Sequence, residues 1–167
     1  MKIRKLTPDN HSKTSALLTK SFPKSTYEVQ LFENLHKNGK TVHEWVCIQT
    51  NKIIAYVAFS NAYNGSEICG LHLGPVAVKH GFRKQGIATE LLNFALRQAE
   101  IKDKAIFVLG NPLFFKRFGF EHCAQPVCPF KKNKYTHFLS LHNNIETQFT
   151  IGYESEFKKK GLAVIMK

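Results

Sequence analysis

The chain has 167 residues and a formal charge of +12, and 43% of its residues are hydrophobic. This apolar content excludes an intrinsically disordered chain, and the length favours a single domain spanning residues 1–167. The excess of positive charge indicates an anionic partner, which is a nucleic acid, a membrane surface or a phosphorylated cofactor.

The N-terminal residues Met1–Lys5 are charged, and no apolar run is long enough to span a bilayer. The sequence therefore predicts a cytoplasmic protein without membrane contact, in which the cysteines stay reduced and buried. Cys123 and Cys128 have C-x4-C spacing, but no matching Cys/His pair lies nearby, so we expect no metal site. The lysine clusters 131–134 and 158–160 are expected to face solvent.

The first predicted elements are two helices. Thr7–Asp9 is typical of a helix start and precedes an apolar stripe at Ala16–Leu18. Ser25–Glu28 matches a capping box, in which the glutamate reaches back to cap the helix start. The residues that follow have apolar side chains at helical spacing, and Gly39 is placed to end this second helix.

Three β-strands are predicted next. Trp45–Gln49 and Ile53–Ser60 are rich in β-branched and aromatic residues and are separated by a short polar segment, which predicts a hairpin. Residues 61–66 contain several turn-forming residues and predict a loop. Ile68–Val78 predicts another strand.

The second half alternates helices and strands. A helix opens at Gly86, with apolar residues recurring every 3.6 positions as far as Ala99. Residues 105–109 predict a buried strand and 113–118 a short helix, while 135–142 and 147–153 predict a closing antiparallel pair. The fold class is therefore mixed α/β (α+β).

A candidate phosphate site lies between the strand ending at Val78 and the helix opening at Gly86. A helix start presents unpaired N–H groups and a partial positive charge, and Arg83 and Lys84 add full charges. Gly81 and Gly86 have the glycine spacing of a Walker loop, but Ile87 and Ala88 replace its Lys and Ser/Thr, and no dinucleotide-binding G-x-G-x-x-G is present. The pattern that remains is R-x-x-G-x-A.

Two motifs relate the sequence to a known family. Leu73–Val78 followed by Phe82–Ala88 resembles the central motif of the GCN5-related N-acetyltransferases, the GNAT family. Val108–Phe120 resembles the second motif of that family, especially in a bacterial subgroup with V-L-G-x-P-x-[YF]-[YF]-x-R-F-G-F. The resemblance implies a GNAT fold, with a mixed central sheet that contains a splayed strand pair and is flanked by helices. It also implies direct transfer of an acetyl group from acetyl-CoA to a primary amine.

The same resemblance implies which residues hold the cofactor, coenzyme A or acetyl-CoA. The pantetheine arm is expected to pair with the backbone of Val76, Ala77 and Val78. The pyrophosphate is expected to bind Arg83, Lys84, Gln85, Gly86, Ile87, Ala88 and Thr89. Further along the arm, Asn111 is expected to contact it, and Phe114 and Phe115 to line its far side.

The transfer needs a neutral amine, a donor to the tetrahedral oxyanion and an exit for the thiolate. His72 and Glu67 are the candidate general bases, while His43, Glu44 and His80 stay open as alternatives. The backbone N–H of Val76 is the oxyanion donor that the resemblance implies.

The family commonly places a tyrosine, as general acid to the leaving sulfur, at the position of Phe115. A thiol leaves as thiolate without strict need of an acid, and Tyr153 and Tyr135 stay open as substitutes.

The acceptor is expected to be a small-molecule or peptide amine, bound near residues 12–39 and 125–134. The positive charge leaves an RNA-linked amine open. A non-catalytic acyl-CoA-binding or sensor domain and a nucleic-acid-binding module are the alternative functions, and a homodimer is possible because dimers are frequent in the family.

Overall fold

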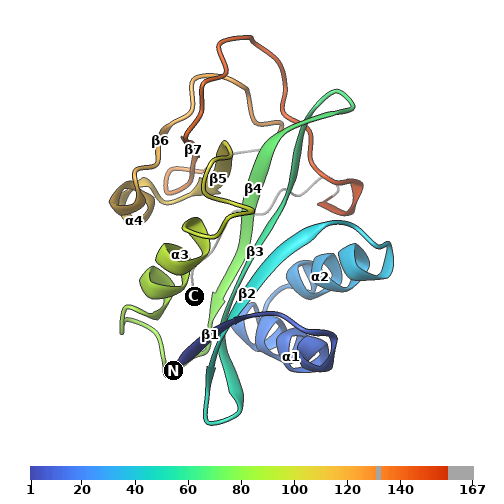
Figure 1. The fold of residues 1–167 in the computed structure, drawn as a ribbon, viewed down its shortest axis with the longest axis vertical. Helices are drawn as coiled ribbons and strands as arrows, with labels where there is room; N and C mark the ends of the chain where they lie inside the picture. Colours follow the sequence, from blue (N-terminus) through green and yellow to red (C-terminus); the bar gives the residue numbers. More distant parts are fainter. Residues whose placement is uncertain (131–132, 158–167) are drawn as a thin grey trace.

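The computed structural model describes residues 1–130 and 133–157, so most of the two lysine clusters lies outside the described residues. A seven-stranded mixed sheet forms the centre, in the order β1-β2-β3-β4-β5-β7-β6 (Figure 1). The strands are β1 (Lys2–Lys5), β2 (Val42–Gln49), β3 (Lys52–Asn64), β4 (Glu67–Val78), β5 (Ile106–Gly110), β6 (Glu121–His122) and β7 (His137–Leu141).

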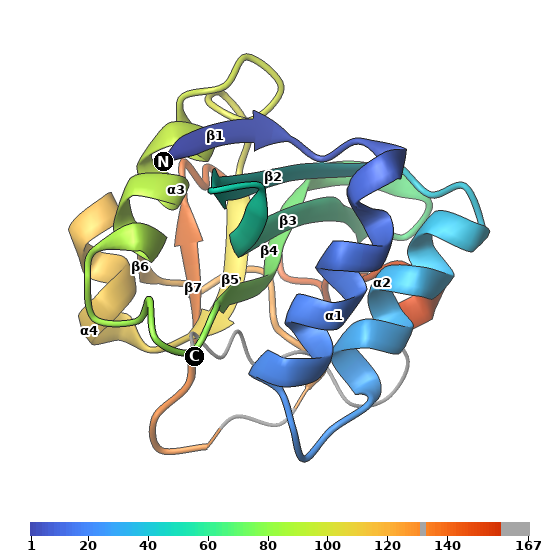
Figure 2. The same cartoon turned by 90° about the horizontal axis from the view of Figure 1, so that it is seen from below.

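Helices cover both faces of the sheet. They are α1 (His11–Ser21), α2 (Tyr27–Lys37), α3 (Ile87–Leu96) and α4 (Pro112–Phe115), with 3-10 turns at Pro8–Asn10, Lys116–Phe118 and Ser155–Phe157. Figure 2 shows α1 and α2 on one side and α3 and α4 on the other. Leu91, Leu92 and Ala95 of α3 pack on one face, and Leu17, Leu18 and Phe32 of α1 and α2 on the opposite face.

Strands β4 and β5 pair over only a short length. These parallel strands pair only at Leu71 with Ile106 and at His72 with Phe107. Beyond these pairs, β4 runs on to Val78 and β5 to Gly110 without pairing to each other. The predicted splayed strand pair is therefore confirmed, and so is the mixed α/β class.

Gly70 lies where this splay closes. A Cβ atom added there would lie 2.4 Å from the carbonyl oxygen of Ala105 and 3.0 Å from Cε2 of Phe107. Since the first neighbour is backbone, Gly70→Ala should push β4 and β5 apart and lower the free energy of unfolding by about 2 kcal/mol. Urea unfolding measures this loss.

The control for this prediction is Gly65→Ala in the β3–β4 turn. An added Cβ has nothing within 4 Å there, and only the backbone conformation, φ +61°, opposes it. A loss of about 1 kcal/mol is expected for the control. Equal losses in the two variants would contradict a contact effect at Gly70.

The strands differ from the sequence analysis in three places. Residues 61–64 are not a loop but continue β3, because buried Ala62 alternates with more exposed neighbours and the turn needs only Gly65 and Ser66. The charged residues Lys2–Lys5, for which no strand was predicted, pair with β2 as an edge strand. Residues 147–153 do not pair with β7, because β5 and β6 occupy both of its edges.

The C-terminal segment crosses the molecule instead of forming a strand. It makes isolated bridges between Val127 and Thr150 and between Tyr63 and Gly152. Its end, residues 152–157, lies over the α1/α2 side of the sheet, where Phe157 packs against Leu31 and Leu35 of α2. We call residues 152–157 the strap.

The predicted helix boundaries also need correction. The capping box at Ser25–Glu28 is wrong, because Ser25 Oγ accepts the N–H of Tyr27 at 3.1 Å, and Glu28 is buried instead of reaching back. The helix that opens at Gly86 ends at Leu96, before Ala99. No helix in residues 1–130 and 133–157 is long and apolar enough to cross a membrane.

Candidate active site

The loop between β4 and α3 is held tightly against the end of β4. Arg83 Nε donates to the Val78 carbonyl at 2.9 Å, and Gln85 Nε2 donates to the Gly81 carbonyl at 3.0 Å. Positive φ angles at Gly81 (96°), Lys84 (62°) and Gly86 (80°) wind the chain into a compact turn. These hydrogen bonds and backbone angles fix the shape of the loop.

The N-terminus of α3 opens from this turn. Gly86 is the N-cap residue, and no side chain caps the helix. The N–H of Glu90 is bonded to the Gly86 carbonyl at 3.0 Å, so the helix bonds begin only there. The N–H groups of the first turn and the positive end of the helix dipole are thus available to an anion.

A cavity of about 420 Å³ lies in front of this helix end. It is lined by Val78, Phe82, Arg83, Lys84, Gly86, Ile87, Ala88, Thr89, Phe114 and Arg117. Three of these side chains are cationic, and among the described residues no acidic side chain lines the cavity. Its shape and charge suit a diphosphate joined to an apolar arm.

Arg117 is a lining residue that the sequence analysis did not assign. Its Nη1 donates to Thr89 Oγ1 at 3.2 Å, and its Cζ lies 4.6 Å from the ring centroid of Phe114. It therefore links α3 to the segment after β5 and adds charge across the cavity from Arg83. Its place in the R-F-G-F pattern was the available signal, but spacing alone does not show that it returns to α3.

The structure brings together most of the expected cofactor residues. Those lining the cavity are Val78, Arg83, Lys84, Gly86, Ile87, Ala88, Thr89 and Phe114. Val76 and Ala77 are buried in β4 at the splay, and Gln85 braces the loop. Asn111 caps α4, because its side chain accepts the Leu113 N–H at 2.9 Å.

Phe115 does not line the cavity. It is buried among Phe114, Phe118 and Phe120. A Cβ on Gly110 would lie 2.5 Å from its Cε2, so the ring fills the space that this glycine leaves.

His72, a candidate base, is buried under the strap. Its Nε2 lies 2.9 Å from the Gly152 carbonyl, and its ring stacks on Tyr153 with centroids 3.6 Å apart. A carbonyl only accepts, so Nε2 carries the proton and donates it. Burial lowers the pKa of His72 to about 4, which makes it a weak base.

Glu67, the other candidate base, is exposed at the start of β4. At the rise of a strand, it lies roughly 30 Å from Val76. The structure therefore does not bring Glu67 to the splay.

The remaining candidates have other partners or lie apart. Glu44 is buried and its Oε2 accepts from Tyr56 Oη at 2.6 Å, with His36 Nε2 at 2.9 Å. Burial lowers the pKa of His43, and burial raises the pKa of the Tyr153 phenol, whose oxygen lies 3.7 Å from Cys128 Sγ. Tyr135 is exposed.

Comparisons with known proteins agree with this geometry. Residues 40–122 match the family model of the acetyltransferase (GNAT) domain. The uncharacterized N-acetyltransferase YhbS of Escherichia coli K12 is 33% identical over 127 residues, which cover 74% of this chain and 75% of YhbS. The chain belongs to the GNAT family.

Solved GNAT structures place a ligand on this fold. E. coli YhbS in complex with CoA has a TM-score of 0.85 and 27% identity to this chain, covering 97% of it and 94% of YhbS. A GNAT acetyltransferase from Brucella melitensis in complex with acetyl-CoA has a TM-score of 0.77 at 22% identity, covering 94% of this chain and 97% of the other, and shows the shared fold.

Proposed function

We propose that this GNAT protein transfers an acetyl group from acetyl-CoA directly to a primary amine. The observation that carries the proposal is the basic cavity at the uncapped N-terminus of α3, which lies beside the splay of β4 and β5. A diphosphate and an extended arm are the two chemical parts of coenzyme A that such a site accepts.

The residues of the cavity divide between these two parts. The first-turn N–H groups of α3, with Arg83, Lys84 and Arg117, would hold the pyrophosphate. Unpaired backbone groups of β4 beyond His72 would bond the arm, which leaves the thioester near Val76. The Val76 N–H is the proposed oxyanion donor.

The reaction then needs a neutral amine. Its nitrogen lone pair attacks the thioester carbon, the C–N bond forms, and the C–S bond breaks with its electron pair leaving on sulfur. Since the pKa of His72 is about 4 and Glu67 lies far from the splay, we assign the released proton to water instead of to either residue.

A calorimetric titration with acetyl-CoA, followed by a CoA-release assay with a mixture of amines, tests this function. We expect micromolar binding, an affinity about tenfold lower in Arg83→Ala, and amine-dependent release. Binding without release would instead favour the acyl-CoA sensor, and salt-sensitive RNA binding without acetyl-CoA binding would favour the nucleic-acid module.

Phe115→Tyr tests the missing general acid. The hydroxyl would be added to a buried ring at the position where the family commonly has tyrosine. We expect turnover to rise by up to about tenfold, because protonation helps a thiolate less than it helps an alkoxide. Steady-state kinetics at saturating acetyl-CoA measure it. An unchanged or lower turnover would show that protonation of the sulfur does not limit the rate.

A further inference from the structure

The buried acidic residues of this basic protein gather on one side. All twelve acidic residues lie in the described part of the chain, and four of them are buried: Glu28, Glu44, Glu154 and Glu156. Glu28 lies on α2, Glu44 contacts α2 through His36, and the other two lie in the strap. A buried carboxylate is costly unless polar or cationic groups surround it.

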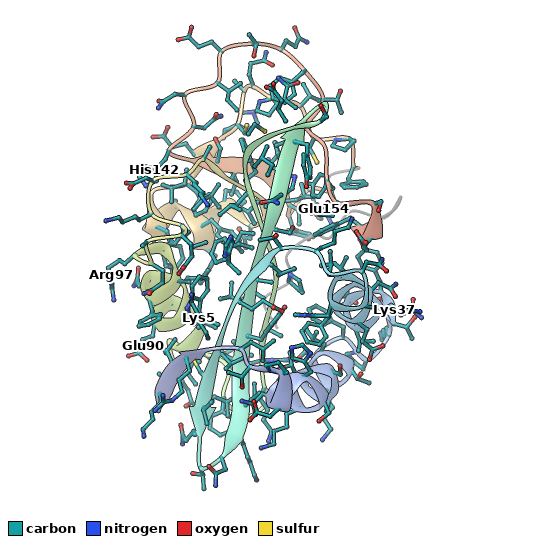
Figure 3. All side chains as sticks on the ribbon, turned by 45° about the vertical axis from the view of Figure 1, so that its right-hand side comes forward. Lys5, Lys37, Glu90, Arg97, His142 and Glu154 are labelled. Atoms are coloured by element: carbon teal, nitrogen blue, oxygen red, sulfur yellow. The ribbon has the colours of Figure 1, made fainter. Side chains whose placement is uncertain are left out.

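Three of the four carboxylates have such partners. Glu44 contacts His36 and Tyr56, as described above. Glu154 accepts from Tyr63 Oη at 3.1 Å and lies 3.5 Å from Lys40 Nζ. Glu156 accepts from Asn38 at 2.7 Å and from Lys40 at 3.1 Å. Figure 3 shows Glu154 at the edge of the layer that α2 forms.

Glu28 is the exception. Glu28 is 6% exposed, and its Oε1 has no hydrogen-bond partner among the described residues. The hydroxyls of Ser21 and Ser60 are likewise buried without a partner within the described chain, and they belong to the same side of the sheet. Ser60 pairs with His72 across β3 and β4. Three of the four buried polar atoms without a partner in the described residues thus lie on this side, and the fourth, Gln125 Oε1, lies in the loop after β6.

The contacts of α2 with β2 and β3 give its direction over the sheet. His36, near the end of α2, contacts Glu44 on β2, and the Phe32 ring lies 5.7 Å from the Tyr56 ring on β3. The helix therefore crosses the strands toward β4 as it is followed back to its start (Figure 2). Glu28 precedes Phe32 by four residues, or about 6 Å along the helix, which is of the order of the strand spacing of about 4.8 Å.

The next strand in this direction carries the proposed thioester site. Tyr56 of β3 pairs with Ala77 of β4, which is next to Val76. The segment of β4 that would hold the end of the cofactor arm therefore lies one strand beyond Tyr56. Glu28 also lies on the buried face of α2, together with Leu31, Phe32 and Leu35. Its carboxylate is therefore directed into the protein, between the sheet and the strap.

We propose that Glu28 binds a second, non-reacting cationic group of the acceptor, which makes the acceptor a diamine or polyamine. This inference rests on the proposed acetyl transfer. A carboxylate stabilises the charged form of an amine that it pairs with, so pairing with the reacting nitrogen would oppose the attack, whereas pairing with a second ammonium adds binding alone. Glu28 gains no proton, and the reacting nitrogen releases its proton to water as before.

The activity test compares putrescine and cadaverine with n-pentylamine, using mass spectrometry of the acetylated products. We expect a higher kcat/KM for the diamines, and a fall of about tenfold or more in the ratio of diamine to monoamine kcat/KM in Glu28→Gln, the size of one charged hydrogen bond. Glu33→Gln is the matched control, since Glu33 lies on the exposed face of the same helix and should keep the ratio. The same ratio in wild type and Glu28→Gln would overturn the proposal.

A second test needs no acceptor. Replacing an unpartnered buried carboxylate by an apolar side chain removes a desolvation cost, so Glu28→Met should raise Tm by about 2 °C or more in the ligand-free protein. Glu44→Met removes a partnered carboxylate and should lower Tm. A lower Tm in Glu28→Met would show that Glu28 already has its partner within the protein, and would overturn the proposal.

The two tests separate this inference from the function on which it rests. If the wild-type protein does not bind acetyl-CoA, the proposed acetyl transfer is contradicted, while the Tm comparison still reports on Glu28. Acetylation of all three amines with equal kcat/KM would support the transfer and overturn the role of Glu28.

Discussion

Gly86→Asp is expected to weaken acetyl-CoA binding by at least a hundredfold. Gly86 lines the cavity at the start of α3, and an added Cβ has nothing within 4 Å there. The side chain therefore fits the ligand-free protein, although φ of +80° costs about 1 kcal/mol. The carboxylate would face the pyrophosphate at the positive end of the helix, where a like charge costs several kcal/mol. Calorimetry with acetyl-CoA measures the affinity.

Gly65→Asp is the control for this result. Gly65 also has a positive φ, +61°, and open space around an added Cβ, but it lies in the β3–β4 turn. It should keep the wild-type affinity at a comparable cost in stability. Equal affinity losses in the two variants would show that the pyrophosphate does not bind at the start of α3.

His72→Gln is expected to flatten the dependence of stability on pH. Burial lowers the pKa of His72 from 6.5 to about 4, so between these values the unfolded chain binds a proton that the folded protein does not. The contribution of His72 to the free energy of unfolding is therefore fully present above pH 6.5. It is lost as the pH falls toward 4, by about 3 kcal/mol in total. Urea unfolding at a series of pH values measures this slope.

The variant keeps the local contact while removing the titration. The Gln side chain retains an N–H donor for the Gly152 carbonyl. Burial also lowers the pKa values of His11 and His43, so both proteins should lose some stability in acid, and the difference between the two slopes belongs to His72. Identical slopes would mean that His72 stays accessible to protons in the folded state.

The parts of the site that local sequence controls could be predicted. The start of α3 was found because a glycine, two cations and a 3.6-residue apolar period stand together in one short segment. The splay was expected from the family resemblance. It is seen in the structure because β4 and β5 share only two residue pairs.

The parts of the structure that depend on contacts between distant segments could not be predicted from the sequence. Whether 147–153 pairs with β7 depends on which edges β5 and β6 already occupy, and no local pattern records this. Arg117 reaches Thr89 from another element, and the sequence around Glu28 predicts a capping residue although the residue is buried. The position of His72 in β4 predicts a general base, but the strap that buries it comes from the far end of the chain.

The short junction between β4 and β5 also affects how the two parts of the sheet hold together. In the part of the chain that the structure describes, the strand pairing between β1–β4 and β5–β7 is limited to the pairs at Leu71 and His72. A pantetheine arm bonded to β4 in the gap beside β5 would act as an additional strand of the sheet. The cofactor would then be a structural element as well as a substrate. The free energy of unfolding of the protein would increase with the concentration of acetyl-CoA.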